Sequence, residues 1–205
     1  MRGEMMFDIF IYGRKFKNLN SRIKTQLFYK PFFKKIGKKT KIIKPLILKN
    51  TNNISLGQNV TINEKVFLMT EFTKKGDIVP NLVINDNVTI GNYNHIVCAN
   101  EIIIENHVLT ADKVYISDNI HCYEDINIPI SMQGIKTKEK TIIGEETWIG
   151  ENSSIICCNI GKHCVIGANS VVLSDIPDYC VAAGIPARII KKYDFEKREW
   201  IKYDS

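Results

Sequence analysis

The sequence lacks the features that mark membrane-spanning or secreted proteins. None of its apolar runs reaches about 18 residues, the length at which a helix crosses a bilayer. Its first residues do not combine an apolar core with a small-residue cleavage site, so we expect no secretory signal. The 205 residues are 44% apolar and 24% charged, which is typical of a globular protein with one main domain.

Cysteines are few and are not arranged for disulfides or for metal binding. The six include no CxxC pair, and Cys157 and Cys158 are adjacent. In a chain of this length, such spacing is not typical of a disulfide framework. We interpret the cysteines as reduced thiols that serve as small apolar residues. This indicates a cytoplasmic location, and we expect no metal.

Acidic residues are scarce at one end of the chain. Residues 1–44 contain two acids against thirteen lysines and arginines, whereas the remainder has twenty acids and fifteen basic residues. We predict a basic helical segment over 1–44. It either contacts an anionic partner, such as the inner membrane surface, or forms a solvated cap on the domain that follows. The lysines that would meet the membrane are Lys30, Lys34, Lys35, Lys38, Lys39 and Lys41.

A six-residue period organises most of the chain. From Ile143 to Val172, aliphatic residues recur at every sixth position, except that the interval from Ile155 to Ile160 is one residue short. Each is usually followed by glycine, two polar residues and a small residue. The same period runs through 56–68, 84–96 and 104–116.

A period of six matches a short strand plus a turn, repeated three times in each coil of a parallel β-helix. The aliphatic residues would point inward and stack at about 4.8 Å, and glycine and asparagine would form the corners. A β-sandwich with scattered glycines would not produce so regular a period. We therefore predict an all-β fold with short helices at both ends: a β-helix over 45–190 and a helical tail over 191–205.

The repeat is interrupted by two polar excursions. Residues 122–140 form the longer one, directly after His121, and residues 70–82 form the other. Loops of more than about 12–15 residues in a compact scaffold are usually functional or disordered. The sequence therefore places the candidate site near His121.

Motifs between 84 and 192 carry a resemblance to a known family. They are Asp118–His121, Tyr123–Ile130, Gln133–Gly134, Ile143–Gly150, Ile166–Val172, Asp175–Pro177 and Ala182–Arg188. Together they resemble the hexapeptide-repeat, left-handed β-helix acetyltransferases. The likeness is greatest to the O-acetyltransferases of capsule or lipopolysaccharide sugars, near the maltose and galactoside acetyltransferases.

The resemblance implies a homotrimer with an acetyl-CoA site between subunits and His121 as the general base. It also implies that Asn92, or its neighbour Asn94, helps to hold the acceptor hydroxyl. Residues that would meet the acceptor are Tyr123, Glu124 and Gln133. Residues that would meet acetyl-CoA are Trp148, Gly150, Gly167, Ala168, Ser174, Arg188 and Lys191. Two departures bear on these contacts: Cys157–Cys158 replaces a common Pro-Gly, and Leu173–Ser174 replaces a common Thr-Lys.

Acetyl transfer to a hydroxyl needs a base, and histidine suits this task near neutral pH. We expect a loop carbonyl or a carboxylate such as Glu124 to hold the second ring nitrogen of His121. The large ring of Trp148 should lie outside the thin coil, lining the cofactor channel or supporting His121. His107 and His163 fall at corners that face solvent, which leaves His95 as the other candidate base.

The predicted function is acetyl-CoA-dependent O-acetylation of a sugar hydroxyl in a bacterial surface glycan, without nucleic acid as a partner. One alternative is N-acetylation of a nucleotide-linked amino sugar. Another is a non-catalytic β-helix subunit that binds glycans.

Overall fold

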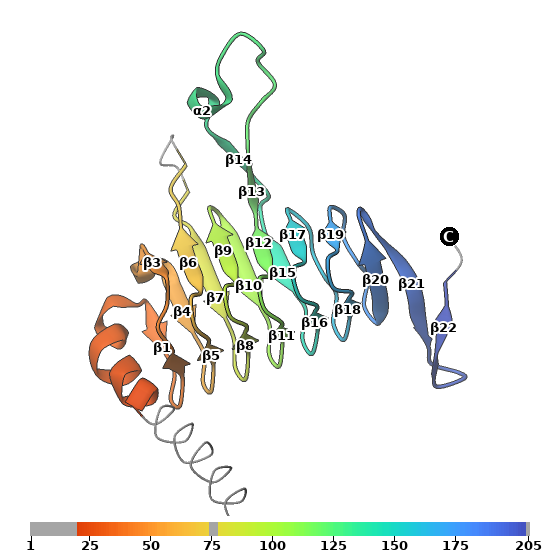
Figure 1. Cartoon of the computed structure of the whole chain (residues 1–205), viewed down its shortest axis with the longest axis horizontal. Coiled ribbons are helices and arrows are strands. Elements are labelled where there is room, and N and C mark those ends of the chain that lie inside the picture. The colour runs from red at the N-terminus through yellow and green to blue at the C-terminus, as the bar shows by residue number, and fades with distance from the viewer. Residues whose placement is uncertain (1–19, 74–77, 204–205) are drawn as a thin grey trace, which may run out of the picture.

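The computed structural model describes residues 20–73 and 78–203. They form a parallel β-helix whose coils are stacked along one axis (Figure 1). The coils contribute short strands to three sheets, and in the last coils Ile160 and Ile176 continue the first sheet as isolated bridges, so the body is a three-sided prism. We call the sheets face A, face B and face C in the order in which the chain passes through them. The predicted parallel β-helix is thereby confirmed.

The strands pair in parallel along each face. Face A contains β1 (Lys35–Ile36), β4 (Ile54–Leu56), β7 (Asn81–Ile84), β10 (Glu101–Ile104) and β15 (Thr141–Ile143). Face B contains β2 (Lys41–Ile42), β5 (Thr61–Ile62), β8 (Thr89–Ile90), β11 (Leu109–Thr110), β16 (Trp148–Ile149), β18 (Val165–Ile166) and β20 (Cys180–Gly184). Face C contains β3 (Ile47–Lys49), β6 (Phe67–Thr70), β9 (His95–Cys98), β12 (Tyr115–Ser117), β17 (Ser154–Ile156) and β19 (Val171–Val172).

Aliphatic columns fill the inside of the prism. Residues in parallel register stack from coil to coil, and their side chains are almost entirely buried. One such column consists of Leu56, Ile84, Ile104, Ile143 and Ile160. Because each coil covers only its neighbours, burial of these columns is what holds the repeats together.

The corners between faces A and B show why polar residues recur there. Asn59, Asn87, His107 and His163 all adopt positive φ values between 51° and 60°. Asparagine tolerates this conformation well, and the Asn59 amide donates to Asn87 Oδ1 at 3.0 Å. His107 and His163 are exposed at this corner, as predicted.

Both excursions leave the prism at the corners between face C and face A, which we call the C–A edge. The longer one begins with β13 (Asn119–His121), which pairs antiparallel with β14 (Ile135–Thr137). The short helix α2 (Ile130–Gln133) lies between them. This two-stranded ribbon projects away from the prism (Figure 1). In the shorter excursion, residues 74–77 fall outside the described residues.

The predicted helical tail over 191–205 is wrong. The chain instead reverses after β20 and forms β21 (Ala187–Asp194) and β22 (Glu199–Lys202), two antiparallel strands that extend face B. The last parallel strand leaves an unpaired edge, and pairing satisfies its backbone groups. Aromatic and β-branched residues such as Ile189, Tyr193 and Trp200 favour strand over helix in this segment.

The predicted helical segment over 1–44 is wrong in its last part, because β1 and β2 already belong to the first coil of the β-helix. Residues 20–24 are α-helical and continue into η1 (Thr25–Tyr29) and η2 (Lys30–Phe32). Residues 1–19 are outside the described residues. A third short helix, η3 (Thr51–Asn53), lies between β3 and β4. Among the helices of the described residues, none combines the length and apolar character needed to span a membrane.

The stacked columns give the first prediction. Ile104 is buried inside the coil, whereas its neighbour Ile103 faces outward and is only partly covered. We expect Ile104→Ala to lower the free energy of unfolding by about 2–5 kcal/mol, because it leaves a cavity in a column that cannot collapse. Ile103→Ala is the matched control and should cost clearly less in a urea titration. Equal losses would show that the column is not the principal source of stability.

Candidate active site

His121 stands at the end of β13, at the base of the long loop. Its side chain is exposed and makes no hydrogen bond or ion pair with any residue in the described ranges. The pairing of His121 with Ile135 across the ribbon holds its backbone in place. Both ring nitrogens are therefore available to a substrate.

A buried carboxylate anchors the ribbon that carries His121. Asp118 is fully buried and accepts the backbone N–H groups of Ala99 and Asn100, both at 2.8 Å. It also accepts the side-chain amide of Asn119 at 2.9 Å, and its own carbonyl accepts Lys138 N–H at 2.7 Å. Asp118 therefore joins two successive coils and both ends of the loop.

Gln133 organises the loop from inside. Its Nε2 donates to the carbonyls of Asp125 and Ile128, at 2.8 and 2.7 Å, and its Oε1 accepts Asp125 N–H at 3.2 Å. The predicted contact of Gln133 with the acceptor would have to replace these bonds. The geometry supports a structural role for this side chain.

Glu124 forms an ion pair with Lys136 across the ribbon. The hydrogen bond from Lys136 lowers the pKa of the Glu124 carboxyl to about 2, so it remains an anion near neutral pH. The prediction that Glu124 holds the second nitrogen of His121 is therefore wrong in this structure, because Lys136 occupies the carboxylate. The exposed ring of Tyr123 lies 5.0 Å from Lys136 Nζ and borders the same surface.

The structure separates Asn92 and Asn94 from His121. Both lie at a corner between faces B and C, not on the C–A edge. Asn92 Nδ2 donates to both carboxylate oxygens of Asp112 at 3.1 Å, and its Oδ1 accepts Glu64 N–H. Asn94 is fully buried and donates to Ala111 O at 2.7 Å. Each amide therefore serves to join coils.

Sequence reasoning missed Asn100, which lies on the C–A edge next to the base of the ribbon. It stands one coil before the start of the ribbon, its N–H is held by Asp118, and its Nδ2 donates to Lys138 O at 3.3 Å. Parallel pairing of Ser117 with Val97 places Asn100 beside the segment that leads to His121. Counting back one full coil, instead of a fixed number of residues, would have found it.

Trp148 lies on the outside, as predicted, and is 48% exposed on face B. It lines a groove of about 470 Å³ with the side chains of the last coils and the terminal strands. The groove is bordered by Glu146, His163, Cys164, Val165, Val181, Ile190, Lys191 and Trp200. An apolar floor with a lysine at its rim is suited to an extended ligand that carries a negative charge.

The other predicted cofactor residues fall mostly beside this groove. Gly150 and Gly167 follow the strands of face B in parallel register, and Ala168 comes next along the chain. Arg188 is exposed on β21 and pairs in register with Ala183. Ser174 lies elsewhere, exposed on the C–A edge beside Asp175.

His121 and Trp148 lie on opposite sides of one prism. The C–A edge is the corner that faces away from face B, and Figure 1 shows the ribbon and the face B strands on opposite sides. The aliphatic core separates them. The predicted support of His121 by Trp148 is therefore impossible within one chain.

His95 has surroundings very different from those of His121. Its ring lies on face C between Phe67 and Tyr115, with centroids 4.0 and 5.4 Å away. Burial lowers the pKa of His95, and its Nε2 is buried without a partner among the described residues. This ring packs as a neutral aromatic group.

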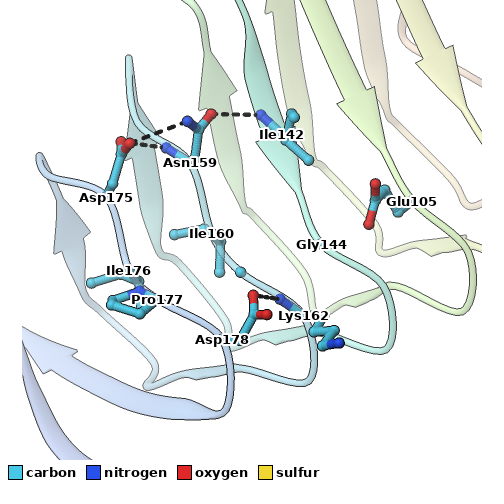
Figure 2. A pocket seen from close by; sticks show the side chains of 11 residues that line it. Glu105, Ile142, Gly144, Asn159, Ile160, Lys162, Asp175, Ile176, Pro177 and Asp178 are labelled. Carbon is cyan, nitrogen blue, oxygen red and sulfur yellow. Dashed lines mark hydrogen bonds between the residues drawn. The ribbon is translucent and has the colours of Figure 1, made fainter.

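A second groove, of about 480 Å³, lies on face A near the last coils (Figure 2). Its polar groups bond to one another: Asn159 donates to Asp175 and accepts Ile142 N–H at 2.9 Å, and Asp178 accepts Lys162 N–H at 2.9 Å. Figure 2 shows these bonds joining successive coils. Within the described part of the chain, no group of three metal-binding side chains converges here or elsewhere.

Comparison with known proteins identifies the class. WbbJ of Escherichia coli K12, named "Putative lipopolysaccharide biosynthesis O-acetyl transferase", is 34% identical over 165 residues, covering 77% of this chain and 81% of WbbJ. The galactoside O-acetyltransferase of the same organism is 28% identical over 181 residues, covering 87% of this chain and 74% of that enzyme. No protein-family profile matches the chain.

Solved structures share the fold. AntD, an N-acyltransferase from Bacillus cereus in complex with dTDP and 3-hydroxybutyryl-CoA, has a TM-score of 0.69 at 22% identity, covering 86% of this chain and 92% of AntD. The hexapeptide-repeat acetyltransferase VCA0836 of Vibrio cholerae, in complex with acetyl coenzyme A, has a TM-score of 0.53 at 21% identity, covering 87% and 86%. The likeness confirms the predicted left-handed β-helix.

The chain belongs to the hexapeptide-repeat acetyltransferases, and it is an acyltransferase.

The anchoring of the ribbon gives the second prediction. Asp118→Asn puts an amide where the carboxylate accepts three N–H groups, and so leaves a buried donor facing another donor. We expect a loss of about 1–3 kcal/mol in the free energy of unfolding. We also expect kcat to fall with little change in acetyl-CoA affinity, because the base of the His121 ribbon shifts.

Asp112→Asn is the matched control, since Asp112 makes a similar bond to Asn92 N–H at 2.7 Å but lies away from the ribbon. It should leave kcat unchanged. A kcat loss as large as that of Asp118→Asn would show that the effect is not specific to the ribbon.

Proposed function

We propose that the protein is an acetyl-CoA-dependent O-acetyltransferase that modifies a sugar hydroxyl of a bacterial surface glycan. The observation that carries the proposal is His121, an exposed histidine without a partner in the described chain, at the base of the long loop. The similarity to WbbJ supports the choice of a glycan acceptor and of oxygen as the acylated atom. Acetyl transfer only to a nucleotide-linked amino sugar would contradict this choice.

His121 is the general base in this proposal. Its neutral imidazole takes the proton of the acceptor hydroxyl while that oxygen forms a bond to the thioester carbonyl carbon. The negative charge that develops on the carbonyl oxygen requires N–H donors in the assembled site. The carbon–sulfur bond then breaks, and the imidazolium returns the proton to the departing sulfur. Acetylated sugar and free CoA thiol result.

We assign the orientation of the acceptor to Asn100 in place of Asn92 and Asn94. The amide of Asn100 lies on the edge that carries His121, whereas those of Asn92 and Asn94 join coils at another corner. Tyr123 offers an exposed ring to a sugar at the start of the loop. The ion pair between Glu124 and Lys136 holds the two arms of the ribbon together beside it.

The groove on face B is the proposed site of acetyl-CoA. Trp148 provides an apolar wall for the pantetheine arm, and the small residues Gly150, Gly167 and Ala168 leave the adjoining corner smooth. Arg188 and Lys191 supply positive charge for the nucleotide phosphates. Ser174, on the opposite side of the chain, would reach the cofactor only from another subunit.

A homotrimer would bring the two half-sites together. His121 and the Trp148 groove lie on opposite sides of one prism, so a complete site needs the C–A edge of one copy and face B of the next. Three such contacts close into a ring of cyclic symmetry. Exposed Leu109 and Ile190 beside the groove would be covered in this assembly.

The domain assignment and the location follow from this proposal. We assign catalysis to the β-helix over 45–190 with its loop; the preceding basic stretch already supplies the first strands of that β-helix, β1 and β2. We place the enzyme in the cytoplasm, where acetyl-CoA is made, with its acceptors assembled at the inner membrane surface. Free thiols at all six cysteines agree with that compartment.

The third prediction tests the base. His121→Ala should lower kcat by about 10²–10⁴-fold while acetyl-CoA affinity changes little, because the cofactor contacts lie elsewhere. His121→Asn should not restore the rate, since an amide cannot take the proton. Thiol release with a panel of sugar acceptors and mass spectrometry of the products provide the measurements.

His107→Ala is the matched control, because it replaces an exposed histidine at a corner away from both the loop and the groove. It should retain nearly full kcat. His163→Ala should also spare the proton transfer, but His163 borders the proposed acetyl-CoA groove, so this variant is read through acetyl-CoA affinity. Turnover like that of the wild type in a folded His121→Ala protein would discard the assignment and direct attention to His95.

The fourth prediction tests the shared site. His121→Ala subunits are coexpressed with Trp148→Ala/Lys191→Ala subunits that carry a different affinity tag, and the mixed assemblies are purified through both tags. These assemblies should regain activity that neither variant has alone. A mixed trimer has one site in three with both wild-type halves, so about a third of wild-type activity is expected. Light scattering should give the mass of three chains.

Two differently tagged His121→Ala subunits, purified in the same way, are the control and should stay inactive. Mixed assemblies without regained activity would mean that each chain carries a complete site. A monomer in light scattering would refute the trimer itself.

A further inference from the structure

The helical segment at the amino-terminal end of the β-helix exposes a row of large apolar side chains. Ile23, Leu27, Phe28 and Phe32 are 50%, 64%, 66% and 69% exposed. All four project from one helical segment, which is α-helical over 20–24, a π-helix over Thr25–Tyr29 and a 3-10 helix over Lys30–Phe32. Large apolar side chains gathered in this way on a protein surface mark a place of contact.

The opposite side of the same segment is fixed to the β-helix. The Thr25 hydroxyl donates to Ser21 O at 2.7 Å and accepts Ile42 N–H at 2.8 Å, while Gln26 Nε2 donates to Gly37 O at 3.0 Å. Tyr29 and Phe33 pack on the aliphatic core. The exposed row is therefore held outward by the fold.

The charge around this row has one sign. Residues 20–44 contain nine lysines and arginines and no acid. Eight of these side chains are exposed: Arg22, Lys24, Lys30, Lys34, Lys35, Lys38, Lys39 and Lys44. Across the described ranges 20–73 and 78–203, none of the eight forms an ion pair with a carboxylate. Lys34 Nζ donates to Asn81 Oδ1 at 3.1 Å and lies near enough to Glu101 to stabilise its carboxylate, whereas the charge of the other seven is available to an external partner.

We propose that this surface, residues 20–39, docks the protein on an anionic lipid bilayer. Phe28 and Phe32 would enter the boundary between headgroups and acyl chains together with Leu27, while the lysines contact lipid phosphates. An apolar row surrounded by charge of one sign fits this boundary, where one side is apolar and the other anionic. An acidic protein groove would not need four such apolar groups within one short helical stretch.

The position of the surface is compatible with catalysis at the membrane. It lies at one end of the prism, whereas the His121 ribbon leaves a long edge at a later coil (Figure 1). A bilayer bound at that end leaves the C–A edge open to acceptors. Membrane docking would bring the proposed enzyme to its glycan acceptors, and to that extent it rests on the proposed function. Lipid binding is measured without acetyl transfer, so either proposal can fail without the other.

The experiment is cosedimentation of the full chain with vesicles made of equal parts phosphatidylethanolamine and phosphatidylglycerol. The wild type should bind these vesicles, bind pure phosphatidylcholine vesicles much less, and be released by about 1 M salt, where the Debye length falls to about 3 Å. Leu27→Asp/Phe28→Asp should abolish binding. Each lysine neutralised, as in Lys35→Gln or Lys38→Gln, should weaken it about fivefold.

Matched controls change similar residues elsewhere. Val79→Asp replaces a 70% exposed apolar residue outside the surface, and Lys197→Gln removes a charge near the other end of the β-helix; both should bind as the wild type does. The proposal would be overturned if the Leu27→Asp/Phe28→Asp protein bound anionic vesicles and duplex DNA as well as the wild type does. That result would show a cationic patch that binds any polyanion without help from the apolar row. A loss of oligomeric mass in that variant would assign the row to a second copy of the chain.

Discussion

Everything in this molecule depends on the stacking of aliphatic residues between successive coils. The columns that include Ile84, Ile104 and Ile143 hold strands of only two to four residues, which could not form a stable sheet alone. Their interior is filled by side chains of one kind and leaves no room for a ligand. Polar chemistry is therefore confined to the corners and the outer faces.

This constraint explains where the functional groups lie. A coil can lengthen only at a corner without breaking the columns, and both excursions leave at the C–A edge. The buried Asp118 turns that edge into a rigid base, because its carboxylate joins two coils and the loop that carries His121. The histidine can then be exposed and still be held in place by its backbone.

The same solid core divides the site that we propose. A thin prism with a filled interior cannot bring His121 and the groove of Trp148 to one point, since they lie on opposite sides. Assembly of several copies is the simple geometric solution, and it would also cover apolar groups such as Ile190. At the amino-terminal end, Phe28 and Phe32 point away from the core and remain exposed, and we propose a different partner for them.

The sequence by itself determined the repeat, the break after His121 and the family, because a six-residue period reports directly which side chains stack. It also placed Trp148, His107 and His163 on the outside correctly. Only the tertiary structure decided that Asn100, not Asn92, shares the edge of His121, since coils differ in length and linear spacing does not follow the corners. Only the structure showed Glu124 held by Lys136, and β21 and β22 in place of a helix. Both depend on pairing across a turn, where the partner and not the local sequence decides the conformation.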